Sequence, residues 1–141
     1  VPPPVAPDAL PRMDVALFGL GSPFADVPSH VYIGGYLEPQ DFTMLDEAQV
    51  VGDCATVFYR ADGSYRDIHL NDRASGPDLD QLRRTPRRIC VVSGASKVAS
   101  LRGALAAKLV TDLVIDEGSA RALLESAMSD MEHASAHMVK P

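Results

Sequence analysis

The hydrophobic positions of this chain form short continuous runs that alternate with helical patterns. The first run, residues 15–18, is apolar throughout and ends at a glycine-rich turn. A continuous run of this kind is typical of a strand buried on both faces of a parallel sheet. Residues 23–37, with scattered aromatics and paired glycines, favour an irregular loop. Residues 39–48 favour a helix, because a proline suits its first turn and apolar residues then share one face.

The middle of the chain predicts a β-hairpin. Residues 50–59 are rich in β-branched and aromatic side chains, which favour a strand. Asp62-Gly63 follows, and this dipeptide is typical of the tight turn between two antiparallel strands. We therefore expect a hairpin that turns at Asp62-Gly63 and returns over residues 65–70, with a short helix at residues 76–84.

The last third of the chain has the most regular pattern. Residues 88–92 and 110–115 favour strands, whereas residues 97–108 and 117–128 favour helices with one apolar face. Strands that alternate with helices at this spacing imply crossover connections. The sequence therefore predicts an α/β fold with a mostly parallel, Rossmann-like sheet flanked by helices and a β-hairpin.

Both ends of the chain differ from the segment between them. Five of the eleven prolines lie in residues 1–13. Because proline fixes φ and lacks a backbone donor, we expect an extended arm or linker here, with a further segment upstream. Residues 14–128 form the expected domain, and residues 129–141, which lack periodicity, are expected to be a flexible tail.

The charge balance argues against a nucleic-acid surface on this domain. The chain of 141 residues carries a formal net charge of −6, with 46% hydrophobic residues. Binding to a phosphate backbone depends on lysines and arginines that neutralise it. One basic cluster exists, at residues 83–88, and it favours a solvated junction between a helix and a strand, with contact to an anion or partner as the alternative.

Metal, redox and catalytic motifs are not recognisable. Cys54 and Cys90 have no CxxC or histidine companion, so we expect buried, reduced thiols, and a disulfide stays open. His133 and His137 are four positions apart but lack the glutamate of HExxH, which favours a solvated pair. No apolar run reaches the roughly 18 residues of a membrane span, and no signal peptide is evident. We expect a cytoplasmic protein without metal, cofactor or catalytic residues.

The turn at residues 93–97, with the sequence SGASK, is the most informative candidate site. It connects the end of a predicted strand to the start of a helix, where small residues allow close approach and amide groups are unpaired. Such a helix terminus suits a phosphate or carboxylate, and Lys97 adds a positive charge. The alternative is an ordinary turn with a solvated lysine.

Two further segments have the residue types of a binding site. Gly21 and Ser22 follow the first strand, but Phe24 stands where the dinucleotide fingerprint needs a third glycine, so a backbone nest or tight turn is favoured over a nucleotide site. Gly52-Asp53 interrupts an apolar stretch. A carboxylate there suits the hydroxyls of a sugar, with an exposed edge or turn residue as the alternative.

In their order and spacing, these motifs resemble one family, the sugar-sensing domain of SorC-type (sorbitol-operon) transcriptional regulators. The similar segments are DVALFGLGSP at 14–23, GYL at 35–37, VGD at 51–53, RASG at 73–76, SGASK at 93–97 and LVIDEGSARALL at 113–124. The resemblance implies the fold of glucosamine-6-phosphate deaminase, ribose-5-phosphate isomerase and CoA-transferases. Our chain would be the carboxy-terminal part of that domain.

The resemblance also implies a function and a site. The domain would bind a phosphorylated sugar and control operator DNA binding through a helix-turn-helix absent from this chain, as a homo-oligomer and not as an enzyme. Asp53 would match the pocket carboxylate of the family and Lys97 its pocket lysine. The expected ligand-binding residues are Gly21, Ser22, Gly52, Asp53, Gly94, Ala95, Ser96 and Lys97. The alternatives are a sugar-phosphate isomerase or deaminase of the same fold, and a dimerisation module without a ligand.

Overall fold

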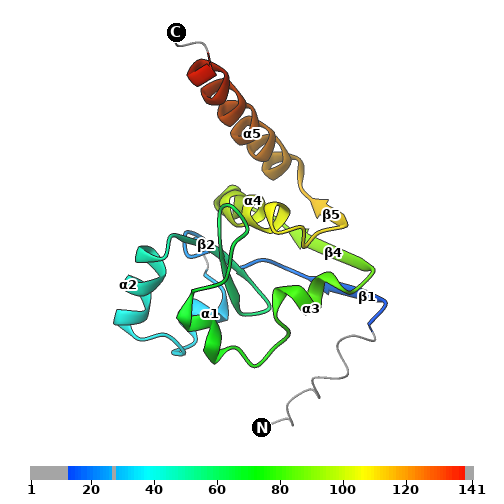
Figure 1. Cartoon of the computed structure of the whole chain (residues 1–141). Helices are drawn as coiled ribbons and strands as arrows, with labels where there is room; N and C mark the ends of the chain where they lie inside the picture. Colours follow the sequence, from blue (N-terminus) through cyan, green and yellow to red (C-terminus); the bar gives the residue numbers. More distant parts are fainter. Residues whose placement is uncertain (1–12, 27, 139–141) are drawn as a thin grey trace.

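The computed structural model describes residues 13–26 and 28–138, so the proline-rich arm expected at residues 1–13 lies outside the described residues except for Met13. The helices and strands follow one another along the chain as shown in Figure 1. In order they are β1 (Val15–Phe18), α1 (His30–Ile33), α2 (Pro39–Glu47), β2 (Val50–Cys54), β3 (Val57–Arg60), the 3-10 helix η2 (His69–Arg73), α3 (Leu79–Arg83), β4 (Arg87–Val92), the 3-10 helix η3 (Ala95–Lys97), α4 (Val98–Ala106), β5 (Asp112–Ile115) and α5 (Glu117–Met138).

The strands form two sheets, which confirms the predicted fold class. The first sheet is parallel, with the strand order β1-β4-β5, and the second is the antiparallel hairpin β2-β3. α4 crosses from β4 to β5 and packs against β2 (Figure 1). Apolar side chains from β4, α4, the hairpin and the segment between α4 and β5 form the main core, among them Tyr59, Cys90, Leu101 and Leu109. Cys54 and Cys90 are both buried and free, so no disulfide joins them.

The hairpin turns earlier in the chain than the sequence predicts. Cys54 pairs with Val57, and the two residues between them, Ala55 and Thr56, have φ values of 50° and 69°. Positive φ at both central positions is typical of a type I′ turn, whose twist matches the flanking strands. The expected turn at Asp62-Gly63 is therefore wrong as the centre of the hairpin, although a tight turn after β3 does form there, with Gly63 donating to the Arg60 carbonyl at 2.9 Å.

No return strand forms at residues 65–70, which contradicts the second half of the predicted hairpin. A side chain takes the place of strand backbone beside β3. Asn71, in η2, accepts a hydrogen bond from the Phe58 amide at 2.7 Å and donates to the Phe58 carbonyl at 3.0 Å. This amide satisfies the groups that a third strand would otherwise pair.

The ends of the parallel sheet also depart from the predictions. β1 is not buried on both faces, because Val15 and Leu17 are exposed while Ala16 packs in the core.

α5 continues to Met138, ten residues beyond its predicted end at Met128, so residues 129–138 are helical and not irregular. Arg102 of α4 holds this helix by hydrogen bonds to Ser126 and Asp130. These contacts between distant segments carry no periodic signal in the sequence.

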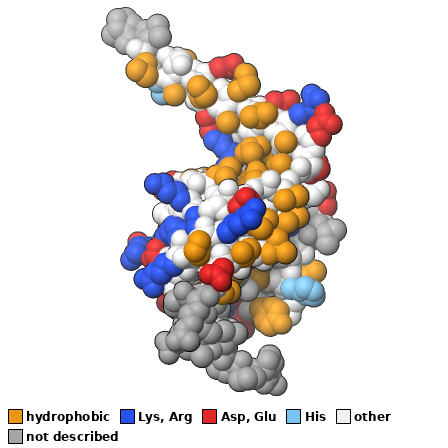
Figure 2. Space-filling view, turned by 90° about the vertical axis from the view of Figure 1, so that its right-hand side faces the viewer, with side chains coloured by type: hydrophobic (Ala, Val, Ile, Leu, Met, Phe, Trp, Pro, Cys, Tyr) orange, Lys and Arg blue, Asp and Glu red, His pale blue; other side chains and the backbone are white. Residues whose placement is uncertain are grey.

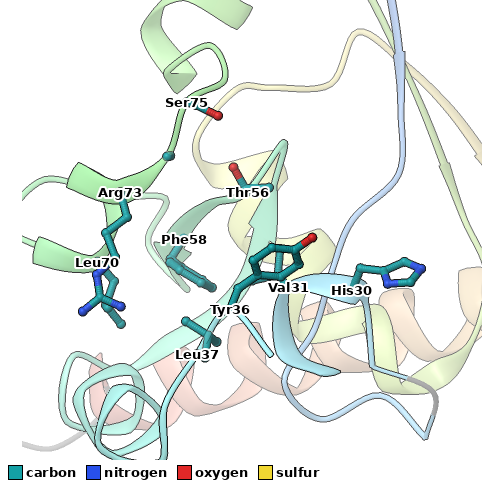
Figure 3. Close-up of a pocket in the computed structure, with 10 residues that line it drawn as sticks. His30, Val31, Tyr36, Leu37, Thr56, Phe58, Leu70, Arg73 and Ser75 are labelled. Atoms are coloured by element: carbon teal, nitrogen blue, oxygen red, sulfur yellow. The ribbon is translucent and has the colours of Figure 1, made fainter. Parts of the chain in front are cut away.

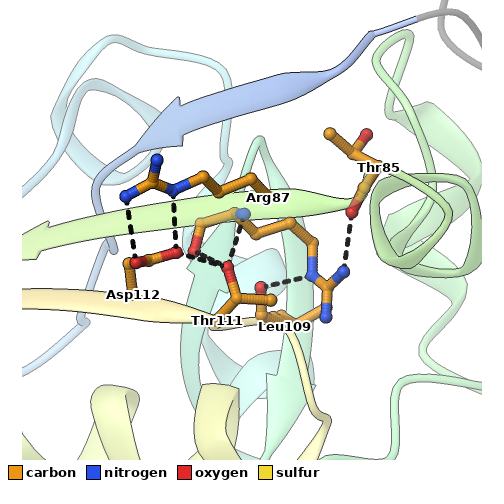
Figure 4. A network of polar contacts seen from close by, with 6 residues as sticks. Thr85, Arg87, Leu109, Thr111 and Asp112 are labelled. Atoms are coloured by element: carbon orange, nitrogen blue, oxygen red, sulfur yellow. Dashed lines mark hydrogen bonds and ion pairs between the residues drawn. The ribbon is translucent and has the colours of Figure 1, made fainter.

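The basic cluster at residues 83–88 is part of the scaffold and not simply solvated. Arg88 donates to the carbonyls of Thr85 at 2.7 Å and Leu109 at 3.0 Å (Figure 4). Arg83 donates to the Ala107 carbonyl at 2.7 Å. Because the last carbonyls of a helix lack intrahelical partners, these guanidinium groups stabilise the carboxyl ends of α3 and α4 and join them.

Replacement of Arg88 should therefore be much more costly than replacement of its neighbour. Arg88→Met leaves several carbonyls without partners, and hydrogen bonds to charged groups are worth about 1.5–3 kcal/mol each, so we expect a loss of about 2–3 kcal/mol in the free energy of unfolding. Arg87→Met, the control, removes only an exposed ion pair with Asp112 and should cost less than about 1 kcal/mol. Urea unfolding of both variants measures the difference, and equal losses would contradict the structural role of Arg88.

Candidate functional site

The two turns singled out in the sequence meet at one edge of the parallel sheet. Residues 19–22 follow β1, and residues 93–97 follow β4, its hydrogen-bonded neighbour. The carboxyl ends of parallel strands lie on the same side of a sheet, which is where open α/β folds bind ligands. Ser22 donates from its hydroxyl to the Ser96 carbonyl at 3.2 Å, so the two turns are in direct contact.

The hairpin reaches the same edge through a backbone bridge. The Gly21 amide donates to the Asp53 carbonyl at 2.9 Å, and the Asp53 amide donates to the Gly21 carbonyl at 3.2 Å. A Cβ on Gly21 would lie 1.8 Å from Oδ1 of Asp53, and one on Gly52 would lie 1.9 Å from Oγ of Ser100. Both positions therefore require glycine, because the Asp53 carboxylate and α4 occupy the space a side chain would fill.

The side chain of Lys97 reaches the turn that follows β1 and is not free in solvent. Its ammonium group donates to the Leu20 carbonyl at 2.6 Å. This is the only hydrogen bond of that ammonium group within residues 13–26 and 28–138, and an ammonium carries three donors. Lys97 also acts electrostatically on Asp53, so the structure brings together the two residues that the sequence singled out.

The backbone amides of the turn at residues 93–97 are less available than the sequence suggests. The Gly94 amide donates to Oγ of Ser119 at 2.8 Å, and the Lys97 amide donates to the Gly94 carbonyl at 3.0 Å. Ser119 in turn bonds Asp116, which holds the pKa of that carboxyl at about 2. The start of α5 thus fixes this turn, and the positive charge for an anion comes chiefly from Lys97.

Three buried polar atoms gather around Asp53 without partners. Oδ1 of Asp53, Oγ of Ser29 and the hydroxyl of Tyr32 have no partner in good hydrogen-bond geometry within the described residues, although the Tyr32 hydroxyl lies close enough to Asp53 to stabilise its charge. Oγ of Ser29 would lie 3.0 Å from a Cβ on Gly21, which places it beside the Asp53 carboxylate. A buried polar group left unsatisfied costs about 1–3 kcal/mol, so such a cluster indicates a site for a polar ligand or bound water.

The surroundings of this cluster change its protonation behaviour. Burial raises the pKa of Asp53, while the Tyr32 hydroxyl and the Lys97 charge oppose that rise. Burial and the neighbouring Asp53 carboxylate both raise the pKa of Tyr32, so its hydroxyl stays a hydrogen-bond donor at neutral pH. Ser29 and Tyr32 were not predicted as site residues, because they lie in the segment 23–37, whose pattern favours an irregular loop.

A separate cavity of about 390 Å³ lies beside η2 and α1 (Figure 3). Neither Asp53 nor Lys97 lines it, so the cavity is distinct from the cluster at the sheet edge. Its lining residues are His30, Val31, Tyr36, Leu37, Thr56, Phe58, Leu70, Arg73, Ala74 and Ser75. Arg73 is tied to the buried Asp41 at 2.9 Å, which links α2 to η2 and makes this guanidinium part of the scaffold.

Two features are absent from the described residues. No helix among residues 13–26 and 28–138 is both long enough and apolar enough to cross a membrane. Within the same ranges, histidine, cysteine, aspartate and glutamate side chains nowhere gather in threes around a point that could hold a metal ion.

Comparison with known proteins points to one group. A family described as "Putative sugar-binding domain" matches residues 6–125. The deoxyribonucleoside regulator of Bacillus subtilis is 35% identical over 113 residues, which are 80% of this chain and 35% of that protein. Our chain thus spans about a third of the length of this curated relative.

Solved structures agree with the sequence matches. A domain of a possible sugar-binding transcriptional regulator from Arthrobacter aurescens has 56% identity and a TM-score of 0.74, over 82% of this chain and 43% of that one. The full-length sorbitol operon regulator SorC from Klebsiella pneumoniae has 26% identity and a TM-score of 0.73, over 83% of this chain and 37% of that one.

The raised pKa of Asp53 predicts a stabilising substitution. The folded state binds this proton more tightly than the unfolded chain, so its contribution to stability is complete below the unfolded-chain pKa and is lost as pH rises through the folded pKa. Asp53→Asn removes the buried charge and should raise the melting temperature at neutral pH. The gain should shrink as pH falls through the raised pKa of the folded state and should vanish below about pH 4, where the carboxyl is neutral in the unfolded chain as well.

Asp116→Asn is the control with the opposite sign. The hydrogen bonds from Ser119 lower the pKa of Asp116, so its charge stabilises the fold above the unfolded pKa and this variant should melt lower at neutral pH. Thermal unfolding followed by circular dichroism at several pH values checks both. A lower melting temperature for Asp53→Asn at neutral pH would show that its carboxylate is satisfied in the folded protein.

Proposed function

Because this chain belongs to the family of sugar-binding domains of bacterial transcriptional regulators, we propose that it senses a phosphorylated sugar at the edge of its parallel sheet. The observation that carries this proposal is the cluster of unpartnered polar atoms around Asp53, with the Lys97 ammonium beside it. The polar atoms around Asp53 suit the hydroxyls of a sugar, and the Lys97 ammonium suits an anion. A sugar phosphate presents both.

The proposed contacts divide between the two ends of such a ligand. Lys97 would bind the phosphate, since an ammonium forms strong hydrogen bonds to anionic oxygens. Asp53, Tyr32 and Ser29 would bind hydroxyls, with Asp53 accepting and Tyr32 donating. The small residues of the turns would form the walls of the site. These residues are Gly21, Ser22, Gly52, Gly94, Ala95 and Ser96.

Sensing is a better explanation of this arrangement than catalysis. Isomerases and deaminases of sugar phosphates need a general base and a proton donor matched to neutral pH. Asp53 is the candidate base, but burial raises the pKa of the Tyr32 hydroxyl beside it, which makes that hydroxyl a poor proton donor at neutral pH. The matched proteins whose names state a function are regulators, which supports a domain that is not an enzyme.

The remaining parts of the proposal concern the whole regulator. With a net charge of −6, this domain suits a sensor whose operator-DNA contacts lie in a separate helix-turn-helix. We place the protein in the cytoplasm as a homo-oligomer. A sugar phosphate would change DNA binding only to the extent that it binds one arrangement of subunits more tightly than another.

A thermal-shift screen against phosphorylated sugars tests the site. A ligand present at 100 times its dissociation constant should stabilise the protein by about 2.7 kcal/mol. Lys97→Ala and Tyr32→Phe each remove a contact to the ligand, and losses of about 1.5–3 kcal/mol correspond to roughly 10- to 100-fold weaker binding. Each variant is compared with its own ligand-free melting temperature, because Lys97 also bonds Leu20.

Tyr36→Ala is the matched control for this screen. Tyr36 is exposed and lines the separate cavity, so the variant should bind the same sugar phosphate with unchanged affinity. A response lost in Tyr36→Ala but kept in Lys97→Ala and Tyr32→Phe would move the ligand to that cavity. Equal shifts in all variants would refute the assignment of Lys97 and Tyr32.

A further inference from the structure

The second half of α5 carries large apolar side chains that lie in solvent. These side chains are 60% to 86% exposed and belong to Leu124, Met128, Met131 and Met138. Every described side chain from residue 127 to residue 138 is exposed. Figure 2 shows hydrophobic side chains along α5 on one side of the molecule. A continuous apolar surface of this kind marks a contact with a partner.

Only the first half of α5 is held by the rest of the chain. Leu123 packs against the main core, and Arg102 of α4 bonds Ser126 and Asp130. Beyond these contacts the helix projects away from the body (Figure 1). Most of the stability of a helix in a protein comes from the packing of its apolar face. A partner that covers the second half of α5 would therefore stabilise it as a helix.

The exposed stretch of α5 also lies outside the residues that this chain shares with the sugar-binding family. The family match ends at residue 125, whereas the exposed stretch covers residues 127–138. This surface thus comes in addition to the matched domain, and the side-chain pattern of α5 itself indicates its occupant.

That pattern is the seven-residue repeat of a helix that pairs with another helix. A large apolar residue recurs every seven positions, and an alanine recurs every seven positions between the large residues. The spacing alternates between four and three residues, which keeps both sets on one side of the helix. The six residues, which we call the α5 seam, are Ala120, Leu124, Ala127, Met131, Ala134 and Met138.

An antiparallel pair of two such helices places large residues opposite small ones. With a twofold axis between residues 132 and 133, Met131 faces Ala134 of the second copy and Met138 faces its Ala127. Each methionine, whose side chain adapts to irregular gaps, then fills the space above an alanine. In a parallel pair methionine would face methionine and alanine would face alanine, which leaves the layers unequal in size. The seam is therefore complementary to itself in the antiparallel orientation, as a closed dimer requires.

Charge and shape agree with the antiparallel pair. Asp130, which flanks the seam and bonds Arg102, comes beside His137 of the second copy, and an imidazole N–H can donate to a carboxylate. Each α5 leaves its own body at its amino-terminal end (Figure 1). In an antiparallel pair the two bodies therefore lie at opposite ends and do not collide.

We propose that residues 127–138 form a dimerisation helix, which pairs antiparallel with the same helix of a second copy of this chain. The contact extends over about 18 Å of helix. An interface of this length is smaller than the standard size of about 1,600 Å², so we expect a dissociation constant on the order of 10 µM. This contact gives the homo-oligomer of the proposed function an interface, and it does not depend on the sugar site.

Sedimentation velocity of the 141-residue chain, without any sugar, tests the proposal. Between about 1 and 200 µM, which brackets a micromolar dissociation constant, the chain should change from monomer to dimer. Met131→Glu puts one unpaired carboxylate from each copy into the seam and should weaken the dimer on the order of 100-fold. Met44→Glu is the matched control, because Met44 is an exposed methionine of α2, far from α5, and this variant should dimerise like the unchanged chain.

Disulfide cross-linking tests the orientation. A mixture of Ala127→Cys and Met138→Cys chains should give a linked dimer with one chain of each kind, much faster than either variant links to itself. The native thiols of Cys54 and Cys90 are buried and do not compete. Faster linking of Ala127→Cys to itself would overturn the antiparallel pairing.

Two results of the sedimentation experiment would overturn the proposal as a whole. One is a chain that stays monomeric over the whole range of concentration. The other is a dimer that Met131→Glu leaves intact, which would assign self-association to another surface. Circular dichroism at a concentration where the chain is monomeric should give Met131→Glu an unchanged melting temperature, since Met131 is exposed. Because no sugar takes part, failure here leaves the proposed function standing, and failure of the sugar screen leaves the dimer standing.

Discussion

The paired backbone hydrogen bonds between Gly21 and Asp53 are the constraint on which the site depends. They tie the antiparallel hairpin to the end of β1 and so bring two separate sheets to one edge. The bridge forms only because Gly21 leaves room for the Asp53 carboxylate and Gly52 leaves room for Ser100 of α4. A side chain at either glycine would push the hairpin away from β1, and Asp53 would no longer lie near Lys97. The same close packing buries the carboxylate, which raises its pKa and leaves one of its oxygens without a partner.

Local patterns predicted the elements that have strong periodicity and failed where side chains from distant segments replace backbone. For the strands and helices from residue 87 onward, most ends were predicted to within a few residues, because β-branched runs and apolar helix faces are local signals. The exception is the end of α5, which lies ten residues beyond the predicted one. The hairpin turn was misplaced for two reasons. Ala55 and Thr56 adopt positive φ without the residue types that favour it, and the Asn71 side chain occupies the edge of β3 where a return strand was expected. The buried faces of β1 were misjudged because an apolar sequence gives no sign of which partner covers it.

The residues of the candidate site likewise differ in whether a local sequence pattern could reveal them. Asp53 and Lys97 could be singled out from the sequence because each stands beside small residues near the end of a strand. The turn after β4 carries Lys97 to the sheet edge, and the bridge to Gly21 carries Asp53 there. Ser29 and Tyr32 could not be singled out, since Tyr32 lies in a four-residue helix within an irregular segment, Ser29 directly precedes that helix, and both reach Asp53 only through tertiary packing. For Arg88 the prediction was wrong in the opposite direction. The basic cluster was expected to be solvated or to contact a partner, whereas the Arg88 guanidinium donates to carbonyls at the ends of two helices that only the folded chain brings together.

The position of the site gives a physical route from ligand to assembly under the proposed function. Its contacts would come from three elements: the hairpin through Asp53, α1 through Tyr32, and the turn between β4 and α4 through Lys97. A ligand that bonds all three stabilises the arrangement in which they meet, and it gains nothing from arrangements in which they part. Coupling between sugar binding and the rest of the regulator would then act through the relative placement of these three elements.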